Sequence, residues 1–255
     1  MPQHDDVAKR EFIAHVCHQF RSPLATIRTC AETLRKECKN DVAKVALLKT
    51  TERHVVRLTR LMDDLLVLYS LTDDRARAES QEIVLTAMVK DFATSIAPLI
   101  RARRLSLKMN IPPEVTVCAK KILLYQVFQN ICENAIKYSP RGRQINIEAH
   151  TCDNQILICI RDRGIGVPDT ERAHIFKPFY RTELARSIDP AGMGLGLSIA
   201  QKIVEFFGGK IWAETNEPTG SSFLFTLPCQ LGGGKSHELS EALRRRLLSQ
   251  NVYKR

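Results

Sequence analysis

The chain has 255 residues, of which 44% are hydrophobic and 26% are charged, a balance that excludes a disordered or fibrous protein. No apolar run approaches the roughly 18 residues of a membrane span, and the first residues lack the apolar stretch of a signal peptide. The formal net charge of +10 favours anionic partners without choosing among them. Eight scattered cysteines, with no Cys-x-x-Cys pair, predict reduced thiols and a cytoplasmic location.

Glycine is distributed unevenly along the chain. All 12 glycines lie at or after Gly142. A long stretch without glycine favours helices, whereas a glycine-rich stretch favours strands, turns and phosphate-binding loops. The sequence therefore predicts an α+β protein, with a helical front joined to an α/β back.

Two apolar stripes with helical spacing mark the front. The first contains Ile13, Val16, Phe20, Leu24, Ile27, Ala31 and Leu34, and the second contains Leu48, Val55, Leu58, Met62, Leu65 and Tyr69. The polar break at 39–41 is short, so we expect two antiparallel helices. Two helices cannot enclose a core. Their near-heptad spacing favours a homodimeric four-helix bundle over packing against the rest of the chain.

Composition divides the chain into four parts. We expect a helical hairpin over 1–72, a polar linker over 73–81, an α/β domain over 82–230 and a basic tail over 231–255. In the α/β domain, helices are predicted at 85–101, 120–138 and 195–207, and strands at 105–111, 115–118, 144–149, 155–161, 210–214 and 222–227. The tail has six basic and two acidic residues, and 236–250 has the pattern of a short amphipathic helix. We expect a solvated end rather than a docking element.

The predicted helix 120–138 carries the first chemical motif. Asn130, Asn134 and Lys137 fall at i, i+4 and i+7, on one face of the helix. Amide oxygens suit Mg²⁺, and lysine supplies a positive charge for phosphate. The same pattern also occurs on ordinary polar helix faces, so it is not specific alone.

Two glycine motifs follow. Asp162-Arg163-Gly164-Ile165-Gly166 comes directly after a strand, where an acid can accept a hydrogen bond from a base amino group. An ordinary surface turn is the alternative. Gly192, Gly194 and Gly196, followed by Leu197, lead into a helix and let backbone N–H groups face an anion. This second motif is neither a Walker A loop nor a Rossmann turn.

In this order and spacing, the three motifs resemble the N, G1 and G2 boxes of the Bergerat-fold (GHKL) ATP-binding domain. Residues 175–181 resemble its F box, and 219–223 resemble its final glycine turn. The resemblance implies an α/β sandwich that holds ATP and Mg²⁺ between a helical layer and a flexible lid at about 181–191.

The resemblance also implies a role for each site residue. Asn134 is the expected Mg²⁺ ligand with Asn130 beside it, Lys137 and Tyr138 approach the phosphates, and Asp162 accepts from the adenine amino group. Gly164 and Gly166 shape the adenine pocket, and Gly192, Gly194 and Gly196 form the lid hinge and phosphate contacts. The expected nucleotide-binding set is completed by Phe176, Phe179, Arg181, Leu197 and Gly220.

Residues 12–24 of the first helix resemble the H box of sensor histidine kinases, with His18 as the phosphorylated residue. A histidine with a pKa near about 6.5 is largely neutral and nucleophilic at neutral pH. Pro23 removes a helical hydrogen bond beside His18. A lone histidine on a helix is usually structural, but Pro23 and the ATP-binding motifs behind it favour the phosphoacceptor interpretation.

Two residues depart from the usual H box. Gln19 replaces the common Glu or Asp, and an amide cannot take the imidazole proton. General base catalysis contributes about 10²- to 10⁴-fold, so we expect slower autophosphorylation. Ser22 replaces the usual Thr or Asn and keeps a hydroxyl that can position water for dephosphorylating a partner.

The sequence therefore predicts a histidine kinase core that phosphorylates His18 from ATP and passes the phosphoryl group to an aspartate of a response regulator receiver domain. A dimeric scaffold or phosphatase with little kinase activity, and a GHKL ATPase, are the alternatives. Asn130 stands where the hydrolytic relatives have a water-activating Glu. We expect no nucleic-acid partner, because no recognition helix accompanies the charge. A membrane becomes relevant only if an upstream region anchors the chain.

Overall fold

The computed structural model describes residue 20 and residues 23–34, 41–70, 80–152, 155–216 and 219–229. The chain divides into two compact units. The first contains residues 1–72 and 174–199, and the second contains residues 73–173 and 200–255.

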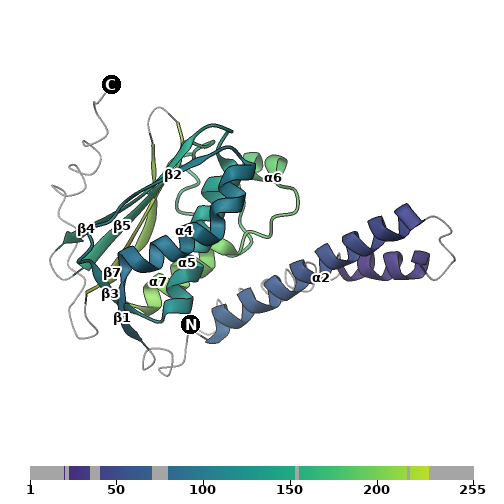
Figure 1. Ribbon diagram of the computed structural model, residues 1–255, viewed down its shortest axis with the longest axis horizontal. Coiled ribbons are helices and arrows are strands. Elements are labelled where there is room, and N and C mark those ends of the chain that lie inside the picture. The colour runs from purple at the N-terminus through teal and green to yellow at the C-terminus, as the bar shows by residue number, and fades with distance from the viewer. Residues whose placement is uncertain are drawn as a thin grey trace. The chain divides into compact units, whose positions relative to one another are not determined.

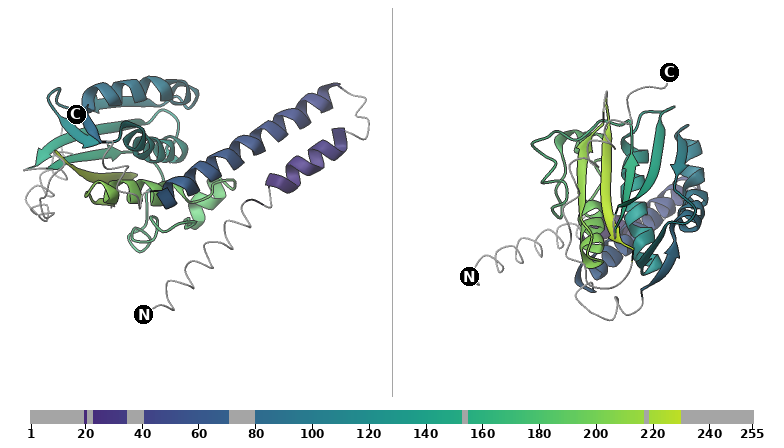
Figure 2. Two further views of the ribbon diagram at one scale, coloured as in Figure 1. Left: turned by 90° about the horizontal axis from the view of Figure 1, so that it is seen from below. Right: turned by 90° about the vertical axis from the view of Figure 1, so that its left-hand side faces the viewer.

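The front of the chain is a helical hairpin. Residues 23–34 form one helix, and α2 (Asp41–Ser70) lies alongside it in Figures 1 and 2. The predicted pair of antiparallel helices is confirmed in the described residues. The second helix begins at Asp41, inside the polar break that was expected to separate the two helices.

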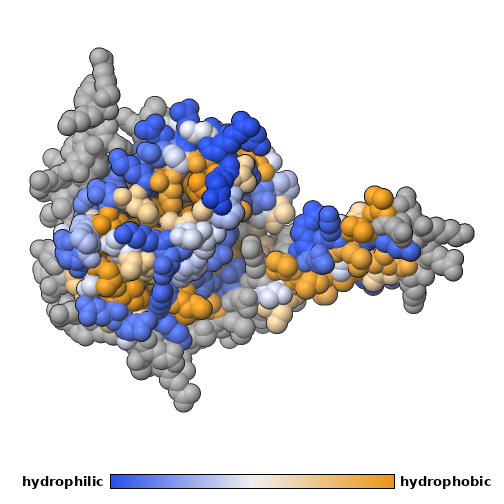
Figure 3. Space-filling view, viewed as in Figure 1, coloured by the Kyte–Doolittle hydropathy of each residue, from blue (hydrophilic) through white to orange (hydrophobic). Residues whose placement is uncertain are grey.

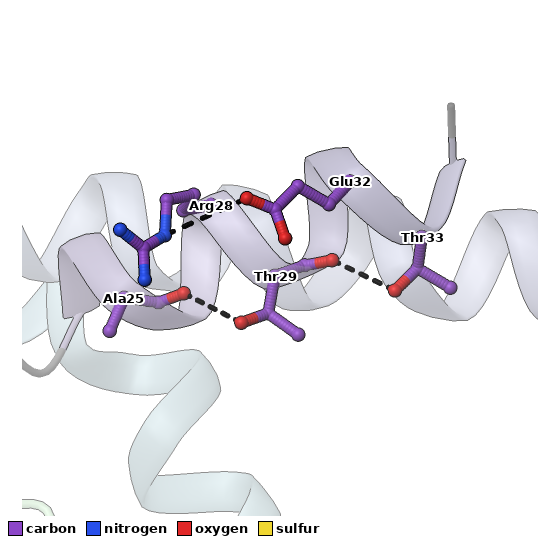
Figure 4. A network of polar contacts seen from close by, with 5 residues as sticks. All are labelled: Ala25, Arg28, Thr29, Glu32 and Thr33. Carbon is purple, nitrogen blue, oxygen red and sulfur yellow. Dashed lines mark hydrogen bonds and ion pairs between the residues drawn. The ribbon is translucent and has the colours of Figure 1, made fainter. Parts of the chain in front are cut away.

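Short-range contacts along the exposed side of the helix at 23–34 stabilise this helix only weakly (Figure 4). Thr29 donates to the carbonyl of Ala25 at 3.0 Å, and Thr33 donates to the carbonyl of Thr29 at 2.8 Å. Arg28 and Glu32 form an exposed ion pair with an Nε–Oε1 distance of 3.7 Å. Such surface pairs contribute about 0.3–0.5 kcal/mol at most. The helix therefore depends on packing of its other face, on which Cys30 is buried.

The back of the chain contains a mixed sheet of five strands in the order β2-β4-β5-β7-β6. Only the β2–β4 pair is parallel, and the β4–β5, β5–β7 and β6–β7 pairs are antiparallel. A separate two-stranded sheet pairs β1 with β3. The strand bounds are β1 (Gln81–Val84), β2 (Ser106–Asn110), β3 (Thr116–Ala119), β4 (Gln144–Cys152), β5 (Gln155–Arg161), β6 (Ile211–Thr215) and β7 (Ser221–Pro228).

Helices α4 (Leu85–Ala102) and α5 (Lys121–Tyr138) cover one face of the sheet (Figure 1). Aromatic side chains connect the layers. The ring centroids of Phe92 and Phe128 lie 6.0 Å apart, and those of Phe128 and Phe225 lie 5.7 Å apart in an edge-to-face arrangement. These rings are fully buried, so the core of the α/β part lies between α4, α5 and the central strands.

The predicted α+β fold class is confirmed, and each predicted helix and strand of the α/β domain is present. The sequence did not predict β1 or α6 (Glu183–Ile188). Both are too short for a periodic pattern, since β1 has 4 residues and α6 has 6. The remaining helix, α7 (Gly196–Phe206), begins at the last glycine of the second glycine motif.

None of the described helices is both long enough and apolar enough to cross a membrane. Where the structure describes cysteine side chains, all are free thiols, as the sequence predicts. They are Cys30, Cys118, Cys132, Cys159 and Cys229.

Candidate functional site

Asp162 lies directly after β5 and is only 5% exposed. Its Oδ1 accepts hydrogen bonds from the backbone N–H of Gly164 at 2.7 Å and of Ser221 at 3.1 Å. Among the described residues, no hydrogen bond reaches Oδ2. Burial raises the pKa of Asp162 to about 6, against the opposing effect of the two N–H donors. The carboxylate is therefore fixed through one oxygen and can accept a ligand's hydrogen bond through the other.

Three glycines let separate backbone segments approach around Asp162. A side chain at Gly164 would stand 2.8 Å from the carbonyl oxygen of Tyr138, at the end of α5. One at Gly220 would collide with the carbonyl oxygen of Asp162, and Gly220 also has φ +112°. Gly166 has φ +74° and faces the carbonyl of Gly220. These positions therefore require glycine for steric reasons. The absence of side chains lets the turn at Asp162–Gly166 pack closely against the final glycine turn at 219–223.

The sequence analysis missed Asn216, which is 5% exposed. Its Nδ2 donates to the backbone carbonyl of Asp162 at 2.7 Å, and its N–H donates to the carbonyl of Gly220 at 3.0 Å. An asparagine after a strand suggests a turn, but its distant partner cannot be read from spacing. Asn216 is thus a positioning residue for the Asp162 turn.

The polar face of α5 holds Asn130, Asn134, Lys137 and Tyr138, and all four side chains are half-buried. The Nδ2 of Asn130 is shielded from solvent and has no hydrogen-bond partner in the described residues. A buried amide without a partner is costly, so this face is suited to a polar ligand. Amide oxygens and a lysine are groups that fit a Mg²⁺–phosphate group.

Glu133 is next to Asn134 but serves a different role. Its Oε1 accepts a hydrogen bond from Nε2 of Gln129 at 2.8 Å, one helical turn away. The Glu133 carboxylate is therefore engaged along its own helix. This arrangement disfavours Glu133 as a base that activates water.

The F box and the second glycine motif belong to the first compact unit and contact each other there. The N–H of Phe179 donates to the carbonyl of Gly194 at 2.9 Å, and Phe179 adopts a φ of +64°, which is uncommon for a residue with a side chain. A side chain at Gly194 would stand 2.8 Å from the carbonyl oxygen of Tyr180. Gly194 thus permits a close contact between the two motifs. Of the other predicted residues, Phe176 is buried, whereas Gly196 and Leu197 lie half-buried in the first turn of α7.

Arg181 organises the predicted lid at 181–191. Its guanidinium donates to the carbonyl of Gly192 at 2.8 Å, to that of Ala185 at 2.7 Å and also to that of Asp189. Thr182 caps α6 by accepting from the N–H of Ala185 at 3.1 Å. The predicted lid therefore contains a short helix held by one arginine. In this structure, Arg181 is engaged with the protein backbone.

Comparison with known families now identifies the chain. Residues 8–74 match the family described as His Kinase A (phospho-acceptor) domain. Residues 119–231 match the family described as Histidine kinase-, DNA gyrase B-, and HSP90-like ATPase. The chain belongs to the sensor histidine kinases.

Curated relatives and solved structures agree with this assignment. Sensor protein kinase WalK of Staphylococcus haemolyticus is 34% identical over 232 residues, which cover 88% of this chain and 37% of WalK. The chain thus spans little more than a third of that histidine kinase. The nucleotide-free catalytic domain of histidine kinase ThkA is 28% identical with a TM-score of 0.53, covering 59% of this chain and 95% of that domain. ThkA in complex with response regulator protein TrrA gives a TM-score of 0.67 at 24% identity, covering 86% and 61% of the two chains.

The predicted phosphoacceptor residues His18, Gln19 and Ser22 lie outside the described residues. Of the H-box segment at 12–24, only Phe20, Pro23 and Leu24 are described, in helical conformation, and Pro23 is buried. The roles of His18, Gln19 and Ser22 stay predictions.

Proposed function

We propose that this chain is the catalytic core of a two-component sensor histidine kinase, which moves the γ-phosphoryl group of ATP to His18 and then to an aspartate of a response regulator. Matches to both the phosphoacceptor and the ATPase families support the proposal. The observation that carries it is the fixed Asp162 carboxylate, with Oδ1 held by two backbone N–H groups. Its second oxygen is suited to the adenine amino group.

Within the second compact unit, the phosphate end of the nucleotide is assigned to α5. Asn130 and Asn134 supply amide groups, and Lys137 supplies a point charge. Asn134 would hold Mg²⁺, which neutralises phosphate charge when it is bound. The residues assigned to nucleotide binding in the other compact unit are Phe176, Phe179, Arg181, Gly192, Gly194, Gly196 and Leu197.

The proposed reaction consists of two phosphoryl transfers. A lone pair of the neutral His18 imidazole attacks the γ-phosphorus, the bond to the β–γ bridging oxygen breaks, and ADP leaves with that electron pair. The phosphorylated ring then loses its other N–H proton to water, because Gln19 can accept a hydrogen bond but not a proton. An aspartate oxygen of the receiver domain next attacks the phosphorus. As the P–N bond breaks, the ring takes a proton back from water and leaves as neutral imidazole. ThkA, which shares the fold, was solved with a response regulator protein.

The helical hairpin is proposed to form a homodimer. Leu48, Val55 and Met62 repeat every seven residues along α2 and are 51%, 48% and 53% exposed. Figure 3 shows apolar residues, in orange, along one side of the hairpin. A second copy would bury this stripe, so Val55→Glu should yield monomers in sedimentation experiments. Arg53→Gln, an exposed change about 160° around the helix from Val55, should not.

The alternatives are less well supported. Engagement of Glu133 by Gln129 disfavours an ATPase that activates water through this residue. Gln19 is the one feature that favours a weak kinase or a phosphatase. We propose the cytoplasm as the location and Ser22 as the residue that positions water for dephosphorylation. A Ser22→Ala protein should then remove phosphate from the regulator more slowly.

Incubation with γ-labelled ATP and Mg²⁺ tests the kinase proposal. We expect an acid-labile, alkali-stable label that is absent from His18→Gln and Asn134→Ala. The His18→Gln protein should still bind ATP, and Gln19→Glu should label faster than the wild type. Label retained by His18→Gln would refute the assigned acceptor, and ATP binding without any label would favour the scaffold or phosphatase.

A further inference from the structure

The sheet has a second face, opposite α4 and α5. Strand pairing places Glu148, Cys159, Leu224 and Trp212 in one row across β4, β5, β7 and β6. Phe225, next in sequence to Leu224, packs on Phe128 of α5, so Leu224 and its row point away from the helices. We call this row, together with Leu157 two residues before Cys159, the outer face.

The outer face is buried to an extent that an open sheet face does not explain. Leu157, Cys159 and Leu224 form an apolar cluster and are 0%, 2% and 3% exposed. Among the described residues, Trp212 is the partly buried apolar side chain that packs against the cluster. Because Trp212 lies at one end of the row, it cannot shield Leu157 as well. The apolar neighbours in the described residues therefore do not account for the burial of this cluster.

Acidic groups border this apolar cluster. Glu148 is the cross-strand neighbour of Cys159, and Glu214 accepts a hydrogen bond from Nε1 of Trp212 at 2.8 Å. Burial raises the pKa of Cys159 to about 11, Arg161 opposes this rise, and the charges of Glu148 and Glu214 add to it. Arg161 donates to the Ser222 hydroxyl at 3.2 Å and is itself buried. Glu148 also forms an ion pair with His150, the register partner of Leu157, at 4.0 Å. The charged groups that border the cluster are therefore two carboxylates, one histidine and the buried Arg161.

We propose that the C-terminal tail of this same chain, residues 236–250, docks on the outer face as an amphipathic helix. The tail begins just after β7, an interior strand of the sheet between β5 and β6, and Gly232-Gly233-Gly234 allow the chain to reverse over it. Leu239, Leu243 and Leu247 recur at every fourth residue and provide the apolar stripe. Residues 236–250 lie outside the described residues, and this proposal differs from the sequence-based expectation of a solvated end.

The dimensions and charges match. A helix from Leu239 to Leu247 is about 12 Å long, and the three strands β5, β7 and β6 span about 10 Å at a spacing of about 4.8 Å. Of the arginines at 244–246, Arg246 lies about 60° from Leu243 on such a helix, beside the stripe, where its charge complements Glu148 and Glu214. Leu248 points to the opposite side of such a helix, at about 140° from Leu243. A matched pair of substitutions can therefore separate the two sides.

Trp212 is the only tryptophan of the chain and reports on the outer face. In the full chain, Leu243→Asp should undock the tail, shift the Trp212 emission to longer wavelength and raise acrylamide quenching about twofold. Leu248→Asp, the same change on the other side of the helix, should leave both signals unchanged. Far-ultraviolet circular dichroism verifies that both variants retain the folded α/β domain.

The proposal fails if Leu243→Asp leaves the Trp212 signals at their wild-type values, because another segment then covers the face. It also fails if both substitutions have equal effects, since the apolar stripe would then not be the docking surface. Quenching that falls with protein concentration would identify a second copy as the occupant instead. None of these readouts requires ATP or kinase activity.

Discussion

The Asp162 turn and the predicted lid, each within its own compact unit, are stabilised in different ways. Around Asp162, backbone groups from β5, the end of α5 and the final glycine turn approach so closely that three positions require glycine. In the lid at 181–191, one side chain, Arg181, donates to three backbone carbonyls. The first arrangement cannot loosen without disturbing the core. The second can be released by one side-chain rotation.

This difference is physically suited to a kinase. The adenine end needs a fixed acceptor, because a hydrogen bond gives specificity only when its geometry is set in advance. Under the proposed function, the segment 181–191 admits ATP and releases ADP, which requires a segment of low local stability. Four predictions test the contrast between the two regions.

Gly220→Ala should have the largest effect. The new Cβ would collide with the carbonyl of Asp162, and φ of +112° strains any residue with a side chain. We expect a loss of roughly 3 kcal/mol in the free energy of unfolding and no measurable nucleotide binding. Urea unfolding followed by circular dichroism measures the loss.

Gly142→Ala is the matched control for Gly220→Ala. Gly142 has φ +80° but no atom within 4 Å of the added Cβ, so this substitution isolates backbone strain. Its expected cost is about 1 kcal/mol. Equal costs for the two variants would show that close packing at Gly220 is unimportant.

Asp162→Asn should have the next largest effect, and it acts on binding. Its oxygen can keep the bonds from Gly164 and Ser221, so the amide nitrogen would face the adenine amino group, donor against donor. Loss of one hydrogen bond to a charged acceptor should weaken ATP binding roughly 10- to 100-fold. Titration calorimetry measures the affinity, and an unchanged Kd would exclude Asp162 as the adenine acceptor.

Much of the fold could be predicted because its signals are local. Helix α5 and strand β5 have periodic or continuous apolar patterns, and both were predicted to within a residue or two of their observed ends. By contrast, α6 buries no side chain, so its sequence needs no apolar stripe. A Thr182 cap and hydrogen bonds from Arg181 hold it instead. Short elements held by polar contacts leave little trace in hydrophobic periodicity.

The candidate site was predictable only where its chemistry is carried by motifs. Asp162, Gly164 and Gly166 are contiguous in sequence, so the pattern was visible. Asn216 acts through the carbonyl of Asp162, 54 residues away, and such a partner follows only from the pairing of β6 with β7. For the same reason, the sequence suggested Arg181 as a nucleotide contact and did not indicate its bonds to lid carbonyls.

Arg181→Lys should loosen the lid without affecting the Asp162 turn. Lysine keeps the positive charge but lacks the planar fork that reaches several carbonyls. We expect faster proteolysis within 181–191, a KM for ATP raised about fivefold, and an almost unchanged free energy of unfolding. Arg186→Gln, an exposed change in the same segment, is the control. If Arg181→Lys is cleaved within 181–191 at the wild-type rate, this position requires a positive charge and not a planar guanidinium.

The last expected effect is a pH dependence of stability that belongs to the Asp162 turn alone. Its pKa is raised from 3.8 to about 6, so the fold favours the protonated carboxyl. The stability from this preference is fully present below about pH 3.8 and is lost as pH rises through about 6. Asp162→Asn cannot ionise. In thermal melts without nucleotide, the Tm of Asp162→Asn minus the Tm of the wild type should therefore increase between pH 4 and pH 7. The corresponding change in the free energy of unfolding is on the order of 2 kcal/mol or less. The Tm difference between Arg181→Lys and the wild type should not change with pH. If the Tm of Asp162→Asn and that of the wild type change in parallel with pH, burial does not shift the Asp162 pKa.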